Sequence, residues 1–135
     1  MIYLLDVNAL VALGFFQHEF HQRVAYWLRG LALRGTAQLA TCSITELGFV
    51  RILAQASQYG FTVSQARTLL LRLKTARILP FTFLADGHDV SHLPEWVRIP
   101  KQITDGHLMA LARSGGAMLA TLDRRIPGAL LIPEK

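Results

Sequence analysis

The sequence predicts an α/β domain in which a mostly parallel β-sheet of about four to five strands is covered by helices on both faces. Two observations carry this prediction: short apolar runs alternate with longer segments of helical periodicity, and no hairpin signal joins one apolar run to the next. Parallel strands need crossover helices, which bury both faces of the sheet. The 135 residues fit one domain, 1–135, because no linker, internal repeat or low-complexity segment divides them.

Short apolar runs are the candidate strands. The first, Ile2–Leu5, is rich in residues that favour strands and ends at Asp6. The others lie at 38–41, at 77–81 as a strand edge, at 117–122 and at 129–132.

Helical periodicity is found between these runs. We expect helices at 7–16, 18–34, 43–60, 64–74 and 104–114. The apolar residues of the third helix are Ile44, Leu47, Ile52, Leu53 and Ala56. The segment 84–101 should be irregular, because Gly87, Pro94 and Pro100 interrupt it.

The charge balance is basic, with 14 Lys and Arg residues against nine Asp and Glu residues and a formal net charge of +5. Eleven of the basic residues are arginines, whose planar guanidinium groups suit phosphate recognition. The balance indicates a nucleic-acid partner, although a general preference for Arg, Ala, Leu and Gly explains it equally well. The apolar fraction of 52% slightly favours a surface that is buried against a protein partner.

A single cysteine, Cys42, excludes an intrachain disulfide and favours a reducing, cytoplasmic location. We expect Cys42 to be a small buried residue, because the sequence places no histidine base beside it. The N-terminus has no basic leader, and Asp6 and Asn8 interrupt its apolar residues, which argues against a signal peptide. No apolar run reaches the roughly 18 residues of a membrane span, so no membrane partner is expected.

Four acidic residues lie where a predicted strand ends or a predicted helix begins. Asp6 and Asp123 follow strand candidates, and Glu46 and Asp105 fall in the first turns of predicted helices. In a parallel sheet these ends meet along one edge, where ligand sites form. We therefore expect the four carboxylates to converge, although they come from distant parts of the sequence.

Each of these acids, taken alone, has a structural explanation. Asp6 fits a helix cap, and Asp123 fits a turn. Ser43 to Glu46 matches a capping box, and Asp105 would complement a helix dipole. The presence of four acids at four such junctions favours a shared site over coincidence.

Converging carboxylates repel one another. Two unit charges 4 Å apart repel by roughly 4 kcal/mol at an effective dielectric near 20, so some of the acids would stay protonated. Divalent cations relieve this repulsion, and all-oxygen ligands suit Mg²⁺ or Mn²⁺.

The four acids lie in the segments 5–10 (LDVNAL), 43–47 (SITEL), 104–108 (TDGHL) and 119–123 (LATLD). Together these segments resemble the acidic motifs of the PIN-domain nucleases. Their order and spacing are similar to those of the bacterial VapC toxins of type II toxin–antitoxin modules, over nearly the whole chain. Any one motif alone would be weak, whereas the set of four is fairly specific.

This resemblance implies a three-layer α/β/α PIN-like fold and a metal-dependent endoribonuclease that hydrolyses RNA phosphodiester bonds with Mg²⁺ or Mn²⁺. The catalytic metal-site residues that it implies are Asp6, Glu46, Asp105 and Asp123. Asn8 and Thr121 match polar positions beside them. The implied partners are an RNA substrate, a cognate antitoxin and a second copy of the chain in a homodimer.

Two other functions compete with this interpretation. Asp6-x-Asn8 after a strand is similar to the aspartyl nucleophile of haloacid-dehalogenase-like phosphatases, but Asn8 stands where they have a second acid. The second is a PIN-like module that binds RNA or protein without cutting. The four acids argue against it, because a protein that only binds does not need clustered negative charges. Arg124 and Arg125, next to Asp123, would either grip phosphates or simply solvate a turn.

The histidines give weaker signals. His18 and His21 are three positions apart, and His88 and His92 are four apart, as zinc ligands on a helix are. Neither pair has a third ligand nearby in the sequence, which disfavours zinc. His107 and the irregular segment 86–92 match no motif that we can assign.

Overall fold

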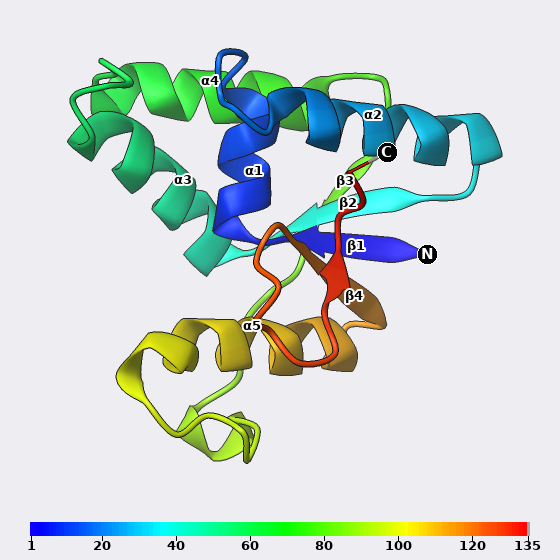
Figure 1. The fold of residues 1–135 in the computed structure, drawn as a ribbon, viewed down its shortest axis with the longest axis vertical. Coiled ribbons are helices and arrows are strands. Elements are labelled where there is room, and N and C mark those ends of the chain that lie inside the picture. The colour runs from blue at the N-terminus through cyan, green and yellow to red at the C-terminus, as the bar shows by residue number, and fades with distance from the viewer. Residues whose placement is uncertain (135) are drawn as a thin grey trace.

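The computed structural model describes residues 1–134 and contains one five-stranded sheet. The strands are β1 (Ile2–Leu5), β2 (Gln38–Thr41), β3 (Phe81–Phe83), β4 (Ala117–Thr121) and β5 (Leu130–Leu131). Every neighbouring pair is parallel, in the order β3-β2-β1-β4-β5 (Figure 1). The prediction of a parallel sheet with crossover helices is confirmed.

Helices cover both faces of this sheet, which gives the three-layer α/β/α arrangement (Figure 1). On one face lie α1 (Val7–Gly14), α2 (His21–Arg34), α3 (Ser43–Gln55) and α4 (Val63–Thr75), and on the other lies α5 (Ile103–Ser114). Two short 3₁₀ turns, η1 (Val90–His92) and η2 (Pro100–Gln102), precede α5. Strand side chains alternate between the two cores: Leu5 packs with the first group of helices, and Leu4 packs with α5.

The edge strand β3 lies further along the chain than the predicted run 77–81. Pairing with β2 begins where the amide of Leu39 donates to the carbonyl of Pro80 at 2.9 Å, and Phe81 then pairs with Leu39. Leu79 is instead buried in the core beneath α1 and α4. Ile78 is 63% exposed, and only the last residue of the predicted run, Phe81, belongs to the strand.

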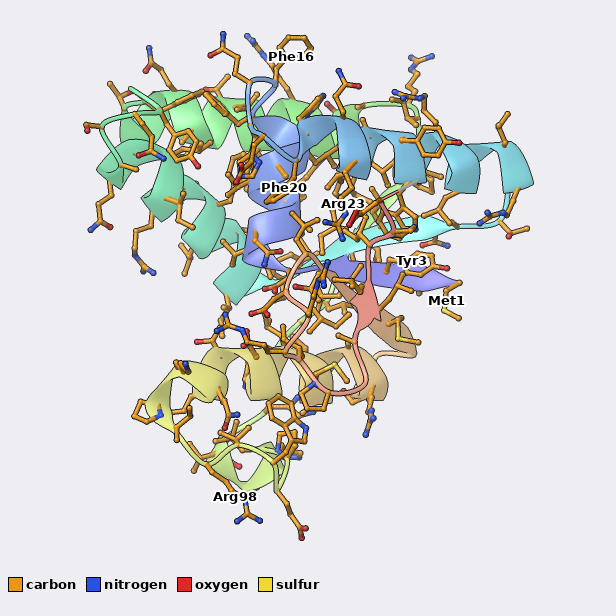
Figure 2. All side chains as sticks on the ribbon, in the orientation of Figure 1. Met1, Tyr3, Phe16, Phe20, Arg23 and Arg98 are labelled. Carbon is orange, nitrogen blue, oxygen red and sulfur yellow. The ribbon has the colours of Figure 1, made fainter. Side chains whose placement is uncertain are left out.

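The first two helices are shorter than predicted, because residues 15–20 form a separate turn. α1 ends at Gly14 and α2 begins at His21. The amide of His18 donates to the carbonyl of Phe15 at 3.0 Å, and its Nδ1 accepts from the amide of Phe20 at 3.0 Å. Phe16 projects from this turn with 76% of its surface exposed (Figure 2).

The core-facing side of α3 differs from the expected set of apolar residues. The helix ends at Gln55, before the predicted Gly60, and it buries Thr45, Phe49 and Leu53, which lie four residues apart on one face. Leu47, one of the expected apolar residues, is 62% exposed. Thr45 thus occupies a core position that the apolar pattern did not predict for it, because its hydroxyl is hydrogen-bonded within the first turn of the helix.

The helix α4 begins at Val63, one residue before the predicted start, because Thr62 caps it. The Thr62 hydroxyl accepts from the amide of Gln65 at 3.0 Å, and the Gln65 side chain accepts from the amide of Thr62 at 2.9 Å. In residues 1–134, no helix combines the length and the apolar character that crossing a membrane requires.

The central strands bring distant polar residues together. β1 and β4 are neighbours, with Leu5 opposite Ala120, and the amide of Asp6 donates to the carbonyl of Ala120 at 2.9 Å. Asp6 and the segment 121–123 therefore leave the sheet side by side at its carboxyl edge, as expected for parallel strands.

Candidate active site

Asp6 is buried at the end of β1, with only 6% of its surface exposed. Its Oδ1 accepts from the amide of Val7 at 2.8 Å, which caps α1, and its Oδ2 accepts from the Thr121 hydroxyl at 2.7 Å. Burial raises the pKa of Asp6, and the nearby charge of Asp123 raises it further, against the lowering effect of these two hydrogen bonds. Asp6 is thus both a helix cap and part of a charged cluster.

Thr121 and Asn8 fix the backbone around Asp6. The Thr121 hydroxyl is fully buried, and besides donating to Asp6 it accepts from the amide of Asp123 at 3.0 Å. The Asn8 side chain accepts from the amide of Leu122 at 3.2 Å and donates to the Thr121 hydroxyl at 3.4 Å. These hydrogen bonds connect the end of β4 to α1. Thr121 and Asn8 therefore fix the backbone at the edge of the sheet where the acidic residues lie.

Asp105 lies in the first turn of α5, on the opposite side of the sheet from α1. Its pKa is raised from 3.8 to about 6, chiefly by burial and then by the charges of Asp6 and Asp123, while Arg125 has a lowering effect. A helix N-terminus by itself would stabilise the charged carboxylate. Burial and the repulsion from two neighbouring aspartates therefore outweigh the simple helix-dipole role.

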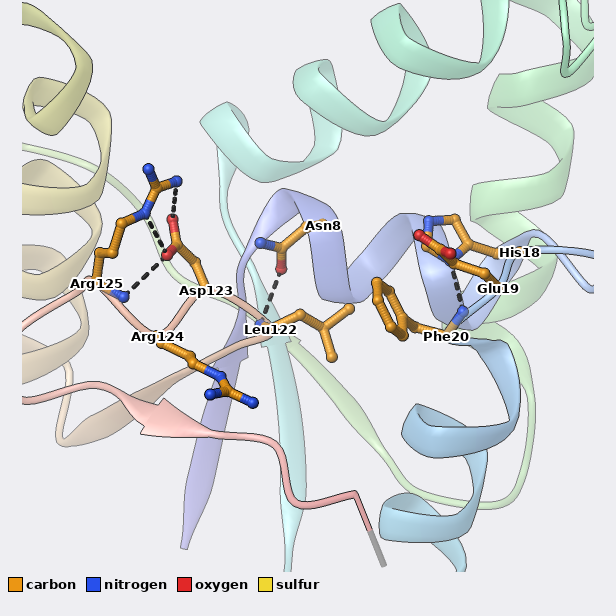
Figure 3. A pocket seen from close by; sticks show the side chains of 8 residues that line it. All are labelled: Asn8, His18, Glu19, Phe20, Leu122, Asp123, Arg124 and Arg125. Carbon is orange, nitrogen blue, oxygen red and sulfur yellow. Dashed lines mark hydrogen bonds and ion pairs between the residues drawn. The ribbon is translucent and has the colours of Figure 1, made fainter.

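Asp123 follows β4 and is paired with Arg125 in a tight turn (Figure 3). Its Oδ1 accepts from the amide and the Nε of Arg125 at 2.9 and 3.0 Å, and its Oδ2 accepts from a terminal guanidinium nitrogen at 3.2 Å. The side-chain hydrogen bond from Arg125 is the main reason why the pKa of Asp123 is lowered. Asp123 is therefore charged, and its charge raises the pKa of Asp6 and, together with the larger effect of Asp6, the pKa of Asp105.

Glu46 lies in the first turn of α3 but does not cap that helix. The capping box is formed by Cys42 and Thr45, whose hydroxyl accepts from the Cys42 amide at 3.0 Å. The Glu46 Oε2 instead accepts from the Thr41 hydroxyl at 2.6 Å and from the Lys74 ammonium at 2.5 Å. Its carboxylate is therefore engaged by β2 and α4.

The structure thus brings three of the four predicted acids into one electrostatic cluster and leaves the fourth paired with a lysine. The charges that raise the pKa of Asp6 and Asp105 are those of aspartates, and Glu46 is not among them. Across residues 1–134, no three histidine, cysteine, aspartate or glutamate side chains are grouped so that they could hold a metal ion as they stand.

The donor chemistry of the cluster nevertheless fits a hard divalent cation. Asp6, Asp105 and Asp123 offer only oxygen ligands, which Mg²⁺ and Mn²⁺ prefer. Two of the three have a pKa raised by burial and by a neighbouring negative charge, and a bound cation would remove that penalty. Asn8 and Thr121 bond to this edge of the sheet without adding charge.

An open pocket of about 580 Å³ flanks this cluster on the side of α2 (Figure 3). Its lining residues are Asn8, His18, Glu19, Phe20, Leu122, Asp123, Arg124 and Arg125. Arg124 is 77% exposed, and its one ion pair within residues 1–134 is a distant one with Glu134 at 3.8 Å, so its guanidinium is accessible to an anion. The pocket places basic groups next to Asp123.

Two contacts near the site have no signal in the sequence. Lys74, at the end of α4, reaches Glu46 only because α3 and α4 pack together. His107 hydrogen-bonds through Nε2 to Asp86 Oδ2, which ties the irregular segment before α5 to that helix. His107, unassigned in the sequence, therefore has a structural contact next to the first turn of α5.

Comparison with known proteins identifies the class. The PIN domain family matches this chain over residues 3–129, and the chain belongs to this family.

Within the family the chain is similar to proteins named ribonuclease VapC. VapC38 of Mycobacterium tuberculosis is 39% identical over 125 residues, which cover 89% of this chain and 84% of the relative. VapC44 of the same organism is 36% identical over 134 residues, which cover 93% and 92%. A crystal structure of VapBC2 from Rickettsia felis, bound to a DNA fragment from their promoter, contains a chain of the same fold, with a TM-score of 0.65, 17% identity and 96% coverage of each chain. The resemblance carried by the four motifs is confirmed.

Replacing the buried Thr121 hydroxyl should destabilise the acidic edge. Thr121→Val keeps the side-chain volume but leaves Oδ2 of the buried Asp6 without its donor, so the free energy of unfolding should fall by about 1–3 kcal/mol. Urea denaturation at pH 7 measures this, with the exposed Thr68→Val as a matched control that should change stability by about 0.5 kcal/mol or less. Equal stability of the two variants would show that the hydrogen bond from Thr121 to Asp6 does not contribute to the free energy of unfolding.

Proposed function

We propose that this protein is an Mg²⁺- or Mn²⁺-dependent endoribonuclease that hydrolyses RNA phosphodiester bonds, and that it is the toxin of a type II toxin–antitoxin pair. One observation carries the proposal. At the carboxyl edge of a PIN fold, Asp6, Asp105 and Asp123 lie close enough for their charges to shift pKa values within the cluster. The names of the VapC relatives support the ribonuclease activity.

In this mechanism the carboxylates of Asp6, Asp105, Asp123 and Glu46 would hold a divalent cation. When bound, such a cation supplies a water activated for attack and positive charge for the departing 3′ oxygen. Thr121 and Asn8 keep the aspartates in position through the hydrogen bonds described above.

The charged groups of the neighbouring pocket complete the mechanism. Arg124, exposed at its rim, is placed to contact a phosphate of the RNA. Arg125, which hydrogen-bonds to Asp123 beside Arg124, would supply a second guanidinium group for phosphate.

Incubation with total RNA tests the activity. We expect new RNA ends with Mg²⁺ or Mn²⁺ and none with EDTA, because the clustered carboxylates repel an RNA phosphate until a cation neutralises them. Sequencing the ends then defines the cleavage site. Cleavage that persists in EDTA would exclude the metal mechanism, and RNA binding without cleavage in either metal would establish a binding module instead.

The proposed partners are RNA, a cognate antitoxin and a second copy of the chain, in the cytoplasm. Exposed apolar side chains support protein partners: Leu33 on α2 is 90% exposed, Leu47 on α3 is 62% exposed, and Leu71 on α4 is 59% exposed. The structural neighbour comes from a VapBC complex, which supports an antitoxin. A strict monomer by light scattering at micromolar concentration, with no partner co-purifying from the native operon, would contradict this part of the proposal.

A further inference from the structure

Lys74 forms the most enclosed ion pair between an acid of the proposed site and a basic side chain. Its Nζ lies 2.5 Å from Glu46 Oε2, and the side chains are only 23% and 24% exposed. The ammonium also lies 5.5 Å from the centre of the Phe83 ring, so β3 supports it from one side. By contrast, Arg125, which pairs with Asp123, is 77% exposed and screened by solvent.

The position of Lys74 follows from packing. α4 ends at Thr75, one residue after Lys74, and α3 and α4 are packed against each other. Glu46 Oε2 is also bonded to the Thr41 hydroxyl at 2.6 Å, so this oxygen already has two donors. A metal that takes Glu46 as a ligand must therefore compete with the ammonium for the carboxylate.

The same contact distinguishes Glu46 from the three aspartates, because Glu46 pairs with a basic side chain that comes from another helix. The charges of Asp6 and Asp123 raise the pKa of Asp105, and the charge of Asp123 raises the pKa of Asp6. The negative charge of Glu46 is compensated by the adjacent ammonium group of Lys74. We infer that Lys74 is an internal counter-ion that holds Glu46 out of the metal pocket until a divalent cation displaces it, so that it sets the metal affinity of the site. This inference rests on the proposed function, since it assumes that the acids bind a metal.

Removal of the counter-ion should tighten metal binding. Lys74→Met keeps the length and the apolar stem that packs near Phe83 but removes the positive charge, so Glu46 becomes free to act as a ligand. The dissociation constant for Mn²⁺ should fall by about tenfold. Titrating metal-stripped protein with Mn²⁺, while measuring free Mn²⁺ by electron paramagnetic resonance, gives this constant without any RNA or activity readout.

Two control variants separate a specific contact from a general loss of charge. Lys74→Arg retains the charge beside Glu46 and should bind Mn²⁺ within about twofold of wild type. Arg67→Met removes one charge from an exposed position of the same helix, roughly 10 Å away, and should also change the constant by about twofold or less. In a Glu46→Gln background the effect of Lys74→Met should largely disappear, because the lysine acts through that carboxylate.

The outcomes are distinguishable from failure of the proposed function. If wild type binds Mn²⁺ and Lys74→Met binds it no more tightly, the counter-ion role is wrong while the metal site stands. An equal gain in Arg67→Met, or an undiminished gain in the Glu46→Gln background, would likewise overturn the role of Lys74. If neither wild type nor Lys74→Met binds Mn²⁺, both the metal site and the counter-ion role are wrong.

Discussion

Neutralising any one of the four acids should lower RNA cleavage by on the order of 10²–10³-fold while leaving the fold intact, since each variant loses several kcal/mol of transition-state stabilisation through the metal. The variants are Asp6→Asn, Glu46→Gln, Asp105→Asn and Asp123→Asn. The initial rate of cleavage of a labelled RNA in Mn²⁺ measures the effect, and circular dichroism checks the fold.

A matched control comes from an acid outside the site. Glu95→Gln removes one negative charge from an exposed position in the irregular segment and should cleave RNA at the wild-type rate. Near wild-type cleavage by three of the four acid variants would exclude a shared site.

Asp105→Asn should make the metal-free protein more stable at neutral pH. The pKa of Asp105 rises from its ordinary value of 3.8 to about 6 in the folded protein, so above pH 6 its charged form is penalised by folding. A pKa raised to this extent means that the charged Asp105 lowers the free energy of unfolding by at most about 3 kcal/mol. Because the group is only half-buried, solvent screening reduces this destabilisation to about 1 kcal/mol. The melting temperature in EDTA at pH 8 should therefore rise by about 3–5 °C.

The sign of this effect depends on pH and on metal. As the pH falls below about 4, Asp105 becomes protonated in both the folded and the unfolded chain, so the advantage of the variant should vanish there. With Mn²⁺ at pH 8 the wild type should gain more stability than the variant, because binding stabilises by RT ln(1 + [L]/Kd) and the variant has lost a ligand. If Asp105 only complemented the helix dipole, the variant would melt lower in EDTA and gain as much from Mn²⁺ as wild type.

Much of the site's position could be predicted from the sequence, because it follows from fold class. Asp6 and Asp123 follow strands of a parallel sheet, and such ends must meet at one edge. Asp105 in the first turn of α5 follows the same rule. The proximity of these three residues can thus be predicted from the local sequence signals for strands and helices together with the order of the strands.

The pairing of Glu46 could not be predicted in this way. Lys74 is 28 positions away, and their contact depends on how α3 and α4 pack. A capping box from Ser43 to Glu46 was the structural alternative in the sequence, whereas the helix is capped one residue earlier by Cys42, with Thr45 as its partner. Hydrogen bonds to the buried Thr45 satisfy its hydroxyl in the core, so Leu47 lies on the exposed side of α3, against the apolar pattern.

The central claim is that four carboxylates form one divalent-cation pocket, and Mn²⁺ binding to metal-stripped protein tests it most directly. Isothermal titration calorimetry of wild type, the four acid variants and Glu95→Gln gives the affinity and the number of sites without RNA. We predict saturable binding to wild type and to Glu95→Gln, and at least about tenfold weaker binding to each acid variant. Absence of saturable binding in wild type, or wild-type affinity in three of the four acid variants, would contradict the shared pocket.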